Sequence, residues 1–371
     1  MSEFKKGLDG VVFDVTTISK TIPEKKSLYY RGYNVAELCD NCSFEQVAYL
    51  LLNKDLPTEK ELSEFISTEK QHRGIPKELI DSIKLFPKTA HPMDAVRTCV
   101  SYLGMQDEFL NSTDNYLNSI KLLAKMPSIV AACSRVKQGL EPIKPSKDLS
   151  FSENFFKMCF DKIPDKEIVK AFDGSLILYA EHGFNASTFV ARSTVSTLSD
   201  ICAGITSAIG TLKGPLHGGA NEAVMYMLKE VGSAEKAESW LKDALKNKKK
   251  IMGFGHRIYR HGDSRVPRMT KYRDKLAELT KNEDLIKLSN SLEKAMVSEK
   301  GIYPNLDFPA GPSYYMMGFE IELFTPIFVM ARTAGWCAHI LEQLADNRLV
   351  RPTSKYVGEE ERQINIKNAS S

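Results

Sequence analysis

NASTFVARSTVSTLSDICAGITSAIGTL, residues 185–212, is the stretch that most clearly indicates the fold class. Its apolar residues recur at steps of three and four, which is the spacing of one face of an α-helix. This stripe comprises Val195, Leu198, Ile201, Ile205, Ala208 and Leu212. Gly214 and Pro215 follow it as a stop signal. We therefore predict one long helix here, with one face buried in a helical core.

Helical signals continue on both sides of this stretch. Capping boxes, in which a hydroxyl and a side chain three residues later satisfy free backbone N–H groups, begin at Ser43 and Thr58. Pro76 and Pro92 occupy positions suited to the first turn of a helix. Further helices are predicted over residues 229–250, 267–279, 284–300 and 320–344. The pattern favours an all-α protein.

The N-terminal residues differ from the rest of the chain. Residues 11–18 and 27–30 are rich in β-branched and aromatic side chains, and a polar stretch with Pro23 separates them. This composition is typical of short strands joined by a turn. We therefore expect a small N-terminal β element beside the helices.

The chain length suggests more than one domain. Its 371 residues correspond to about two domains at roughly 150 residues each. Segments rich in Gly, Pro, His, Arg and Asp interrupt the helices at residues 213–222, 252–267 and 303–312. We predict a multi-helical, two-domain fold in which residues 1–212 and 313–371 form a large domain. Residues 213–312 would be a smaller helical domain inserted into it.

Charge and the N-terminal sequence exclude several classes of protein. Lys plus Arg total 50 and Asp plus Glu total 47, so the net charge of +3 leaves no polybasic arm for nucleic acid. The start MSEFKK lacks an apolar secretory segment, and no stretch of about 18 residues is free of charged side chains. We expect a cytoplasmic protein with neither a nucleic-acid nor a membrane partner.

Cysteine usage agrees with a reducing compartment. The chain has seven cysteines, an odd number, and most lie in apolar helical stretches. Cys39 and Cys42 match C-x-x-C, a spacing found in redox and zinc sites. No second pair stands at zinc-site spacing, so coincidence is the favoured explanation and a redox or metal role is the weaker one.

The first candidate site is the glycine-rich segment around His217, residues 214–222. Small neighbours let a ligand approach the ring, and a helix N-terminus favours negative charge and disfavours a protonated imidazole. A neutral His217 could then donate a hydrogen bond to an oxyanion. An incidental histidine at a glycine-rich helix start explains the pattern equally well.

The second candidate segment, residues 252–267, combines glycine, histidine and arginine. Gly253 and Gly255 open the backbone to a flat ligand, and His256 follows them. The arginines that come next are Arg257, Arg260 and Arg265. Arginine pairs bidentately with carboxylate and phosphate, so an anionic substrate is the favoured interpretation. A solvated basic turn is the alternative.

A carboxylate and further basic residues complete the set of candidates. Asp307 stands in the Pro-rich apolar segment 303–312, where burial would raise its pKa towards that of a general base. A turn or cap role is the commoner one for such an Asp. His182 follows an apolar run, Arg332 interrupts an apolar helix, and Arg351 precedes a proline. A buried Arg332 needs an anionic partner, either a structural carboxylate or a substrate.

Spacing disfavours two common kinds of site. His182, His217 and Asp307 show neither H-x-x-x-H nor H-E-x-x-H spacing, so no metal site is expected. The G-x-S-x-G motif of a Ser-His-Asp hydrolase is absent. Neutral histidines, one carboxylate and several arginines suit proton abstraction next to a carbonyl on a polyanionic substrate, with negative charge stabilised on oxygen.

Several strings, in order, resemble the citrate synthase family, including its 2-methylcitrate synthase members. The resemblance extends from about Gly7 to Gly358 and rests on Tyr29-Tyr-Arg-Gly-Tyr33, His91-Pro-Met-Asp94, Tyr179-Ala-Glu-His182-Gly-Phe-Asn-Ala-Ser187, the segments around His217 and His256, Tyr303-Pro-Asn-Leu-Asp307 and Asp346-Asn-Arg-Leu-Val-Arg-Pro352. It implies a citrate synthase-like fold with a large and a small helical domain. It also implies a homodimer whose active sites use residues of both subunits.

The resemblance further implies a Claisen-type condensation of oxaloacetate with a short acyl-CoA, followed by hydrolysis of the thioester. Asp307 would remove a proton from the acyl group, and His217 would stabilise the resulting enolate at the thioester oxygen. His256 would polarise the ketone of oxaloacetate and protonate the new alkoxide. The residues that resemble the family's oxaloacetate-binding set are His182, Arg265, Arg332 and Arg351, the last reaching across from the partner subunit.

By the same resemblance, coenzyme A enters only as part of the acyl-CoA co-substrate, with no permanently bound cofactor. Arg260 would contact its phosphates, and the backbone at Gly253 and Gly255 would cradle the adenine. Acetyl-CoA and propionyl-CoA differ by one methylene, which a pocket distinguishes by only about 1–3 kcal/mol. The sequence favours neither, so the product would be citrate, 2-methylcitrate or both.

Two other functions are weighed against this one. A non-catalytic helical protein could bind an acyl-CoA or a dicarboxylate, but the presence of His217, His256 and Asp307 together counts against it. A related lyase or ligase that cleaves citrate or citryl-CoA would be favoured by an attached nucleotide-binding segment, and none is visible in the sequence.

Overall fold

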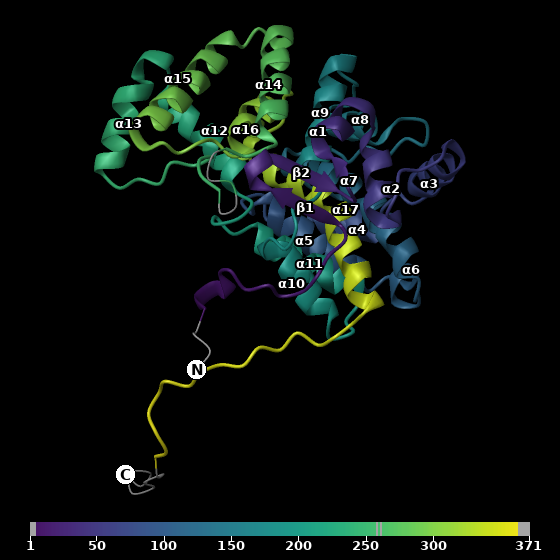
Figure 1. The fold of residues 1–371 in the computed structure, drawn as a ribbon. Helices are drawn as coiled ribbons and strands as arrows, with labels where there is room; N and C mark the ends of the chain where they lie inside the picture. Colours follow the sequence, from purple (N-terminus) through teal and green to yellow (C-terminus); the bar gives the residue numbers. More distant parts are fainter. Residues whose placement is uncertain (1–4, 257–258, 260–261, 363–371) are drawn as a thin grey trace, which may run out of the picture.

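A computed structural model describes residues 5–256, 259 and 262–362 of the chain. Figure 1 shows a body built almost entirely from helices, beside a small sheet near the N-terminus. The predicted all-α class with a small N-terminal β element is confirmed. Within the described ranges, no helix has both the length and the apolar character that a membrane span requires.

The N-terminal sheet is antiparallel and has the order β1-β2-β3. Its strands are β1 (Ser19–Ile22), β2 (Ser27–Tyr30) and β3 (Tyr33–Asn34). Ser19 pairs with Tyr30, and the short 3-10 helix η2 (Pro23–Lys25) connects the first two strands. Lys26 ends this connection in the left-handed conformation with φ 45°, which reverses the chain direction.

Residues 11–18 do not form the predicted strand. They follow the 3-10 helix η1 (Lys6–Leu8) as an extended segment without a partner strand among the described residues. Phe13 packs edge-on against Phe184 and Phe189, with ring centroids 5.9 and 5.0 Å apart. Phe13 therefore packs on other parts of the chain instead of pairing in the sheet, whereas Val11, Val12 and Val15 are exposed.

The first half of the helical body confirms the predicted start signals. Both capping boxes are present, at Ser43 and Thr58, and Pro92 is the first residue of its helix, whereas Pro76 lies one position earlier as an N-cap. The helices are α1 (Val35–Asn41), α2 (Phe44–Asn53), α3 (Glu59–Gln71), α4 (Lys77–Lys84), α5 (Pro92–Leu103), α6 (Asp107–Leu110), α7 (Asn115–Lys137), α8 (Phe151–Phe160) and α9 (Lys166–Tyr179).

The stretch predicted as one helix over residues 185–212 forms two, α10 (Ala186–Val195) and α11 (Ile201–Leu212), which pack against each other. Asp200 caps α11 by accepting a hydrogen bond from the Ala203 N–H at 2.9 Å. Leu198 adopts a left-handed φ of 66° and is 76% exposed, so it is not part of the core. The prediction of one helix failed because the apolar residues keep their spacing of three and four through the turn between α10 and α11.

The helices α12 to α16 gather at one end of the molecule (Figure 1). They are α12 (Ala220–Val231), α13 (Ala237–Lys246), α14 (Val266–Thr280), α15 (Glu283–Lys300) and α16 (Asp307–Met316). α14 and α15 confirm two predicted helices. The helix predicted over residues 229–250 is wrong, because Gly232 with φ 81° ends α12 and the 3-10 helix η3 (Ala234–Lys236) precedes α13. The inserted domain at residues 213–312 stays a prediction.

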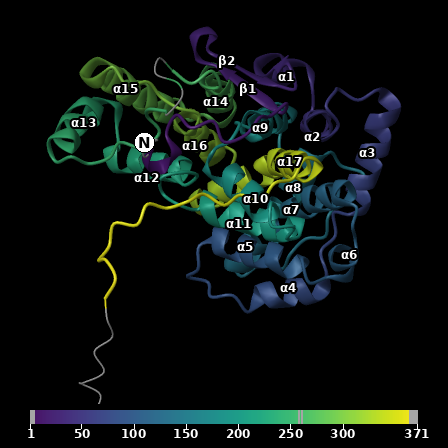
Figure 2. The same cartoon turned by 60° about the horizontal axis from the view of Figure 1, so that its bottom comes forward.

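The last helix, α17 (Phe324–Ala345), lies among the others and confirms the helix predicted near residues 320–344 (Figure 2). It follows the short 3-10 helix η4 (Ile321–Leu323) and packs against α2, α7, α9, α10 and α11. Arg332 and Trp336 are among its buried side chains. After Ala345 the chain has no helix or strand up to residue 362; Asn347 and Val350 still donate hydrogen bonds to Ser196, and the residues beyond Val350 leave the body as an exposed segment (Figure 1).

Candidate active site

Asp307 is the first residue of α16 rather than the loop residue that the sequence suggested. The Asn305 Oδ1 atom accepts the Asp307 N–H at 3.1 Å, which supports the turn at the helix start. The Tyr179 hydroxyl, at the end of α9, donates a hydrogen bond to Asp307 Oδ1 at 2.7 Å. The carboxylate therefore lies where α9 meets α16 and has a fixed orientation.

The surroundings of Asp307 give it the properties of a general base. Burial raises the pKa of Asp307 from 3.8 to about 6, although the Tyr179 hydrogen bond and the positive charge of Arg265 partly oppose this change. A carboxylate with this pKa is largely ionised at neutral pH and is a stronger base than an exposed Asp. The raised pKa agrees with the expectation from the sequence.

His217 lies between α11 and α12, just before Gly219, the N-cap of α12. Its Nε2 atom is 2.8 Å from the Ser187 hydroxyl oxygen and accepts the Ser187 backbone N–H at 3.3 Å. Because Nε2 accepts the Ser187 N–H, we assign the proton of a neutral ring to Nδ1; the Ser187 hydroxyl has a second acceptor in Asn185 Oδ1 at 2.8 Å. Trp336 of α17 donates to the same Ser187 oxygen at 3.1 Å, and this contact holds the hydroxyl in place.

The His217 ring is neutral over the whole physiological pH range. Burial lowers the pKa of His217 to about 4, and the positive charge of Arg332 acts in the same direction. A neutral imidazole donates a hydrogen bond to a developing oxyanion without first having to gain a proton. The Nδ1–H group of His217 is thus suited to that task.

His182 and His256 form a second pair of neutral imidazoles. Their ring centroids are 5.1 Å apart, and Tyr259 packs against both rings. Burial and the positive charge of Arg265 lower the pKa of His182 well below its usual value, and the same two causes lower the pKa of His256 to about 4. The Nε2 atom of His182 is buried with no hydrogen-bond partner among the described residues. A buried polar atom of this kind is suited to a ligand contact.

Arg265 is held at the start of α14 by a carboxylate. Its Nε and Nη2 atoms donate to the two Asp263 oxygens at 3.0 and 2.7 Å, and both side chains are buried. Burial alone would raise the pKa of Asp263, but the Arg265 guanidinium holds it well below its usual range. The Asp263 Oδ2 atom also accepts the Leu306 N–H at 3.2 Å, which ties Arg265 to the residue before Asp307.

Arg332 on α17 is buried but, within the described residues, makes no ion pair. Its Nε atom donates to the Tyr179 carbonyl at 2.7 Å, and its guanidinium stacks over the Phe328 ring at 4.7 Å. Burial lowers the pKa of Arg332 to about 10. The sequence left open whether its anionic partner is a structural carboxylate or a substrate. The buried Glu181 carboxylate acts on this charge but forms no ion pair with it, so the guanidinium remains available to an anionic substrate.

The two predicted glycines have structural reasons for being glycine. Gly253 and Gly255 adopt φ of 80° and 77°, and a Cβ on Gly253 would lie 2.5 Å from a methyl group of Val224. The carbonyls of both glycines accept hydrogen bonds from Asn305, through its N–H and its side-chain amide, each at 2.9 Å. This loop is therefore bound to the segment that precedes Asp307.

Of three further predicted arginines, two lie outside the described residues and one is exposed. Arg257 and Arg260, the second of which was the expected contact to coenzyme A phosphates, lie outside the described residues. Arg351 is exposed, in the segment that leaves the body after α17. Within one subunit it does not take part in the site.

Four side chains that hold the site together were not predicted from the sequence, namely Tyr179, Ser187, Asp263 and Trp336. Tyr179 and Ser187 lay within a string quoted for the family resemblance, but no local spacing connected them to Asp307 or His217. Asp263 stands two residues before Arg265, so a close carboxylate–arginine pair was a signal that could have been used. Trp336 gave no signal, because a tryptophan in an apolar helix is usually a core residue.

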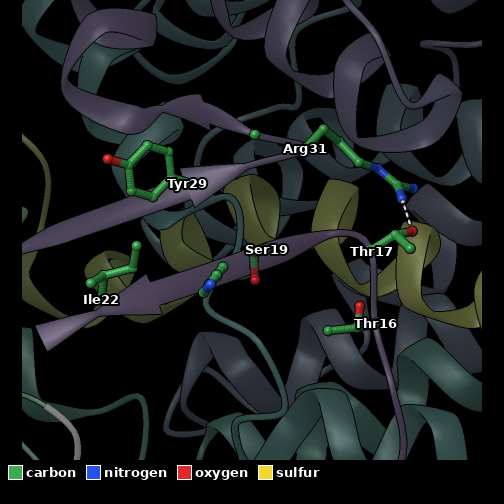
Figure 3. A pocket seen from close by; sticks show the side chains of 8 residues that line it. Thr16, Thr17, Ser19, Ile22, Tyr29 and Arg31 are labelled. Atoms are coloured by element: carbon green, nitrogen blue, oxygen red, sulfur yellow. Dashed lines mark hydrogen bonds between the residues drawn. The ribbon is translucent and has the colours of Figure 1, made fainter.

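A separate cavity of about 320 Å³ opens on the N-terminal sheet (Figure 3). None of the predicted site residues lines it; its lining residues are Thr16, Thr17, Ser19, Lys20, Ile22, Tyr29, Arg31 and Gly32. Arg31 donates to Thr17 Oγ1 at 2.6 Å and to the Leu51 carbonyl at 2.8 Å. Its guanidinium is therefore already hydrogen-bonded within the chain. Ser19 donates to Glu181 Oε1 at 2.8 Å and links this region to the loop of His182.

The described residues contain no group of His, Cys, Asp and Glu side chains that could hold a metal ion. All seven cysteines are free thiols. Burial raises the pKa of Cys39 to about 12, and it also raises the pKa of Cys42. A thiol with a raised pKa is a poor nucleophile and metal ligand at neutral pH.

The fold and the cluster together define a helical protein with a buried base, neutral histidines and a buried arginine pair. The chain matches the family model described as citrate synthase, C-terminal domain, over residues 7–353. It is 51% identical over 362 residues to a citrate synthase of Mycolicibacterium smegmatis, covering 97% of this chain and 96% of that protein. It is 50% identical over 361 residues to a 2-methylcitrate synthase of Mycobacterium tuberculosis, covering 97% and 92%. The chain belongs to the citrate synthase family.

Solved structures agree with this assignment. The citrate synthase of Thermotoga maritima matches with a TM-score of 0.89 and 37% identity over the whole of both chains. The citrate synthase of Thermoplasma acidophilum, in ternary complex with carboxymethyl coenzyme A and oxaloacetate, matches with a TM-score of 0.93 and 32% identity, covering 98% of this chain and 99% of that one. The predicted citrate synthase-like fold is confirmed.

Proposed function

We propose that this enzyme condenses oxaloacetate with a short acyl-CoA and then hydrolyses the thioester, releasing citrate or 2-methylcitrate and free coenzyme A. One observation carries this proposal: Tyr179 hydrogen-bonds both to the proposed base, Asp307, and to the proposed anion-binding residue, Arg332. Its hydroxyl bonds to Asp307, and its carbonyl accepts the Nε–H of the unpaired Arg332. A proton-abstracting carboxylate and a binding site for a carboxylate substrate are thereby adjacent, as a condensation of these two substrates requires.

In the first step, ionised Asp307 takes a proton from the carbon next to the thioester carbonyl. Such a hydrogen is weakly acidic, so removal needs simultaneous stabilisation of the negative charge that develops on oxygen. The Nδ1–H of neutral His217 donates to that oxygen. The enol or enolate carbon then attacks the ketone of oxaloacetate and forms the new C–C bond.

In the second step, His256 donates a hydrogen bond to the ketone oxygen and passes its N–H proton to the new alkoxide, and the proton that Asp307 took from the acyl group then returns through water to the imidazole ring. His182, Arg265 and Arg332 bind oxaloacetate, with the arginines pairing with its carboxylates. Water then attacks the thioester carbonyl of the condensed intermediate. The C–S bond breaks, and coenzyme A leaves as the thiol after gaining a proton.

Coenzyme A takes part only as a portion of the co-substrate, and no permanently bound cofactor or metal is required. We assign contact with its phosphates to Arg260, and contact with its adenine to the backbone at Gly253 and Gly255. Both glycines adopt a left-handed φ that glycine tolerates best, so the loop carries no side chain of its own at these two positions. We place the reaction in the cytoplasm, consistent with seven free thiols.

We further propose that the active enzyme is a homodimer in which Arg351 completes the oxaloacetate site of the partner subunit. Arg351 is exposed in a segment that leaves its own body, so it is available to a second copy of the chain. A solvated guanidinium forms only weak hydrogen bonds with water. Next to a dicarboxylate, the same group forms stronger, bidentate hydrogen bonds with the carboxylates.

The proposal is tested by following free thiol release from acetyl-CoA and from propionyl-CoA, side by side, with and without oxaloacetate. We expect thiol release that depends on oxaloacetate with at least one of the two. The ratio of their kcat/KM values identifies the preferred acyl group, which the names of similarly close relatives leave open. Thiol release no greater than background with both would overturn the proposal in favour of a non-catalytic binding protein.

Asp307→Asn provides the control that separates chemistry from folding. We expect this variant to lose turnover while its calorimetric affinity for oxaloacetate stays nearly unchanged, because His182 and both buried arginines remain. Loss of turnover and of binding together would assign Asp307 a structural role instead.

A further inference from the structure

The segment that carries His217 is held on both sides by one turn of α5. His91 is the N-cap of α5, and Asp94 lies in its first turn. Lys213 precedes His217 in sequence and forms an ion pair with Asp94, whereas Glu222 follows His217 and bonds to His91. The string His91-Pro-Met-Asp94 has no place in the proposed reaction, yet its two polar side chains reach the two ends of this segment.

The upstream contact fixes the point where the His217 segment begins. The Lys213 Nζ atom lies 2.6 Å from each carboxylate oxygen of Asp94, and Lys213 is the C-cap of α11. From there the chain reverses tightly, because the Gly218 N–H donates to the Leu212 carbonyl at 2.8 Å. A Cβ on Gly218 would lie 2.5 Å from that carbonyl oxygen. The place of His217 therefore depends on where Lys213 is held.

The downstream contact fixes the first turn of α12. Glu222 is buried, and its Oε2 atom is 3.0 Å from His91 Nε2, while its Oε1 atom accepts the Thr325 N–H at 3.1 Å. The Met93 N–H donates to His91 Nδ1 at 3.2 Å, so a neutral His91 carries its proton on Nε2 and donates it to Glu222. This contact joins the starts of α5, α12 and α17.

We infer that His91 and Asp94 are positioning residues that together hold His217 where its Nδ1–H meets the thioester oxygen. This inference rests on the proposed function of His217 as the oxyanion donor. Such a donor stabilises the transition state only when it is held close to its ideal place, and an error of about 1 Å can cost on the order of a hundredfold in rate. Ser187 orients the ring, but the ring follows the backbone that the α5 turn anchors.

The ion pair between Lys213 and Asp94 can be removed with little effect on folding. The two side chains are 39% and 30% exposed, and ion pairs of this exposure contribute little to stability. The variants are Asp94→Asn and Lys213→Met. Lys84→Met is the matched control, since Lys84 forms a comparable pair with Glu141 at 2.7 Å on α4, away from His217.

We expect kcat for thiol release to fall about tenfold in Asp94→Asn and in Lys213→Met, because His217 is misplaced. The affinity for oxaloacetate should not change, since none of its proposed ligands is touched, and Tm should match that of Lys84→Met. The double variant should be no slower than Asp94→Asn alone, because Asp94→Asn already removes the ion pair with Lys213 as well as the one with Arg97 at 3.1 Å. A structural role alone would lower Tm and leave kcat unchanged.

His91 allows a rescue test. His91→Gln keeps an N–H donor near the position of Nε2, whereas His91→Ala removes it. We expect His91→Gln to retain most of the wild-type kcat and His91→Ala to lose about tenfold. Equal kcat values for both variants and the wild type would overturn the inference at this end of the segment.

A second measurement does not depend on turnover. In protein labelled with ¹⁵N-histidine, the imidazole nitrogen signals of His217, assigned with His217→Gln, report its tautomer and its contact with Ser187. We expect these signals to shift in Asp94→Asn and not in Lys84→Met; unchanged signals would refute the positioning role. A wild type without thiol release would instead refute the proposed function, while the signals would still decide whether the α5 turn positions His217.

Discussion

Asp307 carries its charge in surroundings that disfavour charge, and this determines how the enzyme should respond to pH. With its pKa raised to about 6, the base is protonated and inactive in mild acid. We expect kcat/KM for the acyl-CoA to fall about tenfold for each pH unit below 6. A pH–rate profile at saturating oxaloacetate measures this limb. A rate that stays level down to pH 5 would contradict the assignment of Asp307 as the base.

The same carboxylate should lower the stability of the protein at neutral pH. The pKa of Asp307 is 3.8 in the unfolded chain and about 6 in the folded protein. Its contribution to the free energy of unfolding is therefore fully present below about pH 4 and is lost as the pH rises through 6. We expect Asp307→Asn to gain about 1–3 kcal/mol in urea unfolding at pH 8, and progressively less towards pH 4. Asp263→Asn is the control of opposite sign, because Arg265 lowers the pKa of Asp263 and its charge stabilises the fold at pH 8.

Tyr179 should set the strength of the base. Its hydrogen bond lowers the pKa of Asp307, so Tyr179→Phe is expected to move the acid limb of the pH–rate profile to higher pH and to reduce kcat at pH 7. Tyr314→Phe is a matched control, since Tyr314 is equally buried but donates to Ser175 at 3.1 Å instead. If both variants keep the acid limb of the pH–rate profile at the wild-type pH, Tyr179 does not set the pKa of Asp307.

At the scale of single elements, local signals predicted helix starts well and helix interiors less well. The boxes at Ser43 and Thr58 could be predicted because each needs only residues three apart. The break between α10 and α11 could not, because its apolar spacing does not distinguish a turn from a continuing helix. Pro312 disfavours a helix interior and makes the segment of Asp307 resemble a loop, whereas packing of α16 on α12 and α14 outweighs that preference.

Two helical glycines provide a test of close packing at this scale. A Cβ at Gly335 of α17 would lie 2.3 Å from the Ala180 carbonyl and 2.5 Å from Glu181 Oε2. We expect Gly335→Ala to lower the free energy of unfolding by about 1–3 kcal/mol, with thermal unfolding as the measurement. At Gly210 of α11 a Cβ would meet only the Arg97 side chain, at 3.6 Å. Gly210→Ala should therefore be neutral or stabilising by up to about 1 kcal/mol.

At the scale of the whole molecule, the sequence singled out candidate segments for the chemistry but did not predict how they meet. His182, His256 and Asp307 each stood out locally, and the structure brings their three segments together through α9, α14 and α16. The links themselves span long stretches of chain, as from Tyr179 to Asp307 or from Ser187 to His217, and no periodicity reports such contacts. Arg351 shows the limit most plainly, because its proposed role requires a second chain.

That role can be tested with hybrid dimers. Asp307→Asn and Arg351→Ala are each expected to be nearly inactive alone. In a mixed dimer, one site combines the intact Asp307 of one subunit with the intact Arg351 of the other. Random mixing of equal amounts by co-expression should therefore restore about a quarter of the wild-type specific activity. Activity no higher than that of the separate variants would show that Arg351 acts within its own subunit or not at all.

The lone charge of Arg332 has a consequence for the order in which the substrates act. Arg265 is paired with Asp263, whereas Arg332 forms no ion pair in the described chain and only the more distant charge of Glu181 opposes it; the charges of Arg265 and then of Arg332 lower the pKa of Asp307. A dicarboxylate bound to Arg332 would cancel that effect, so Asp307 becomes a stronger base only once oxaloacetate is in place. The empty enzyme would then seldom enolise acyl-CoA, and wasteful breakdown of the thioester without a C–C bond would be suppressed by electrostatics as well as by shape.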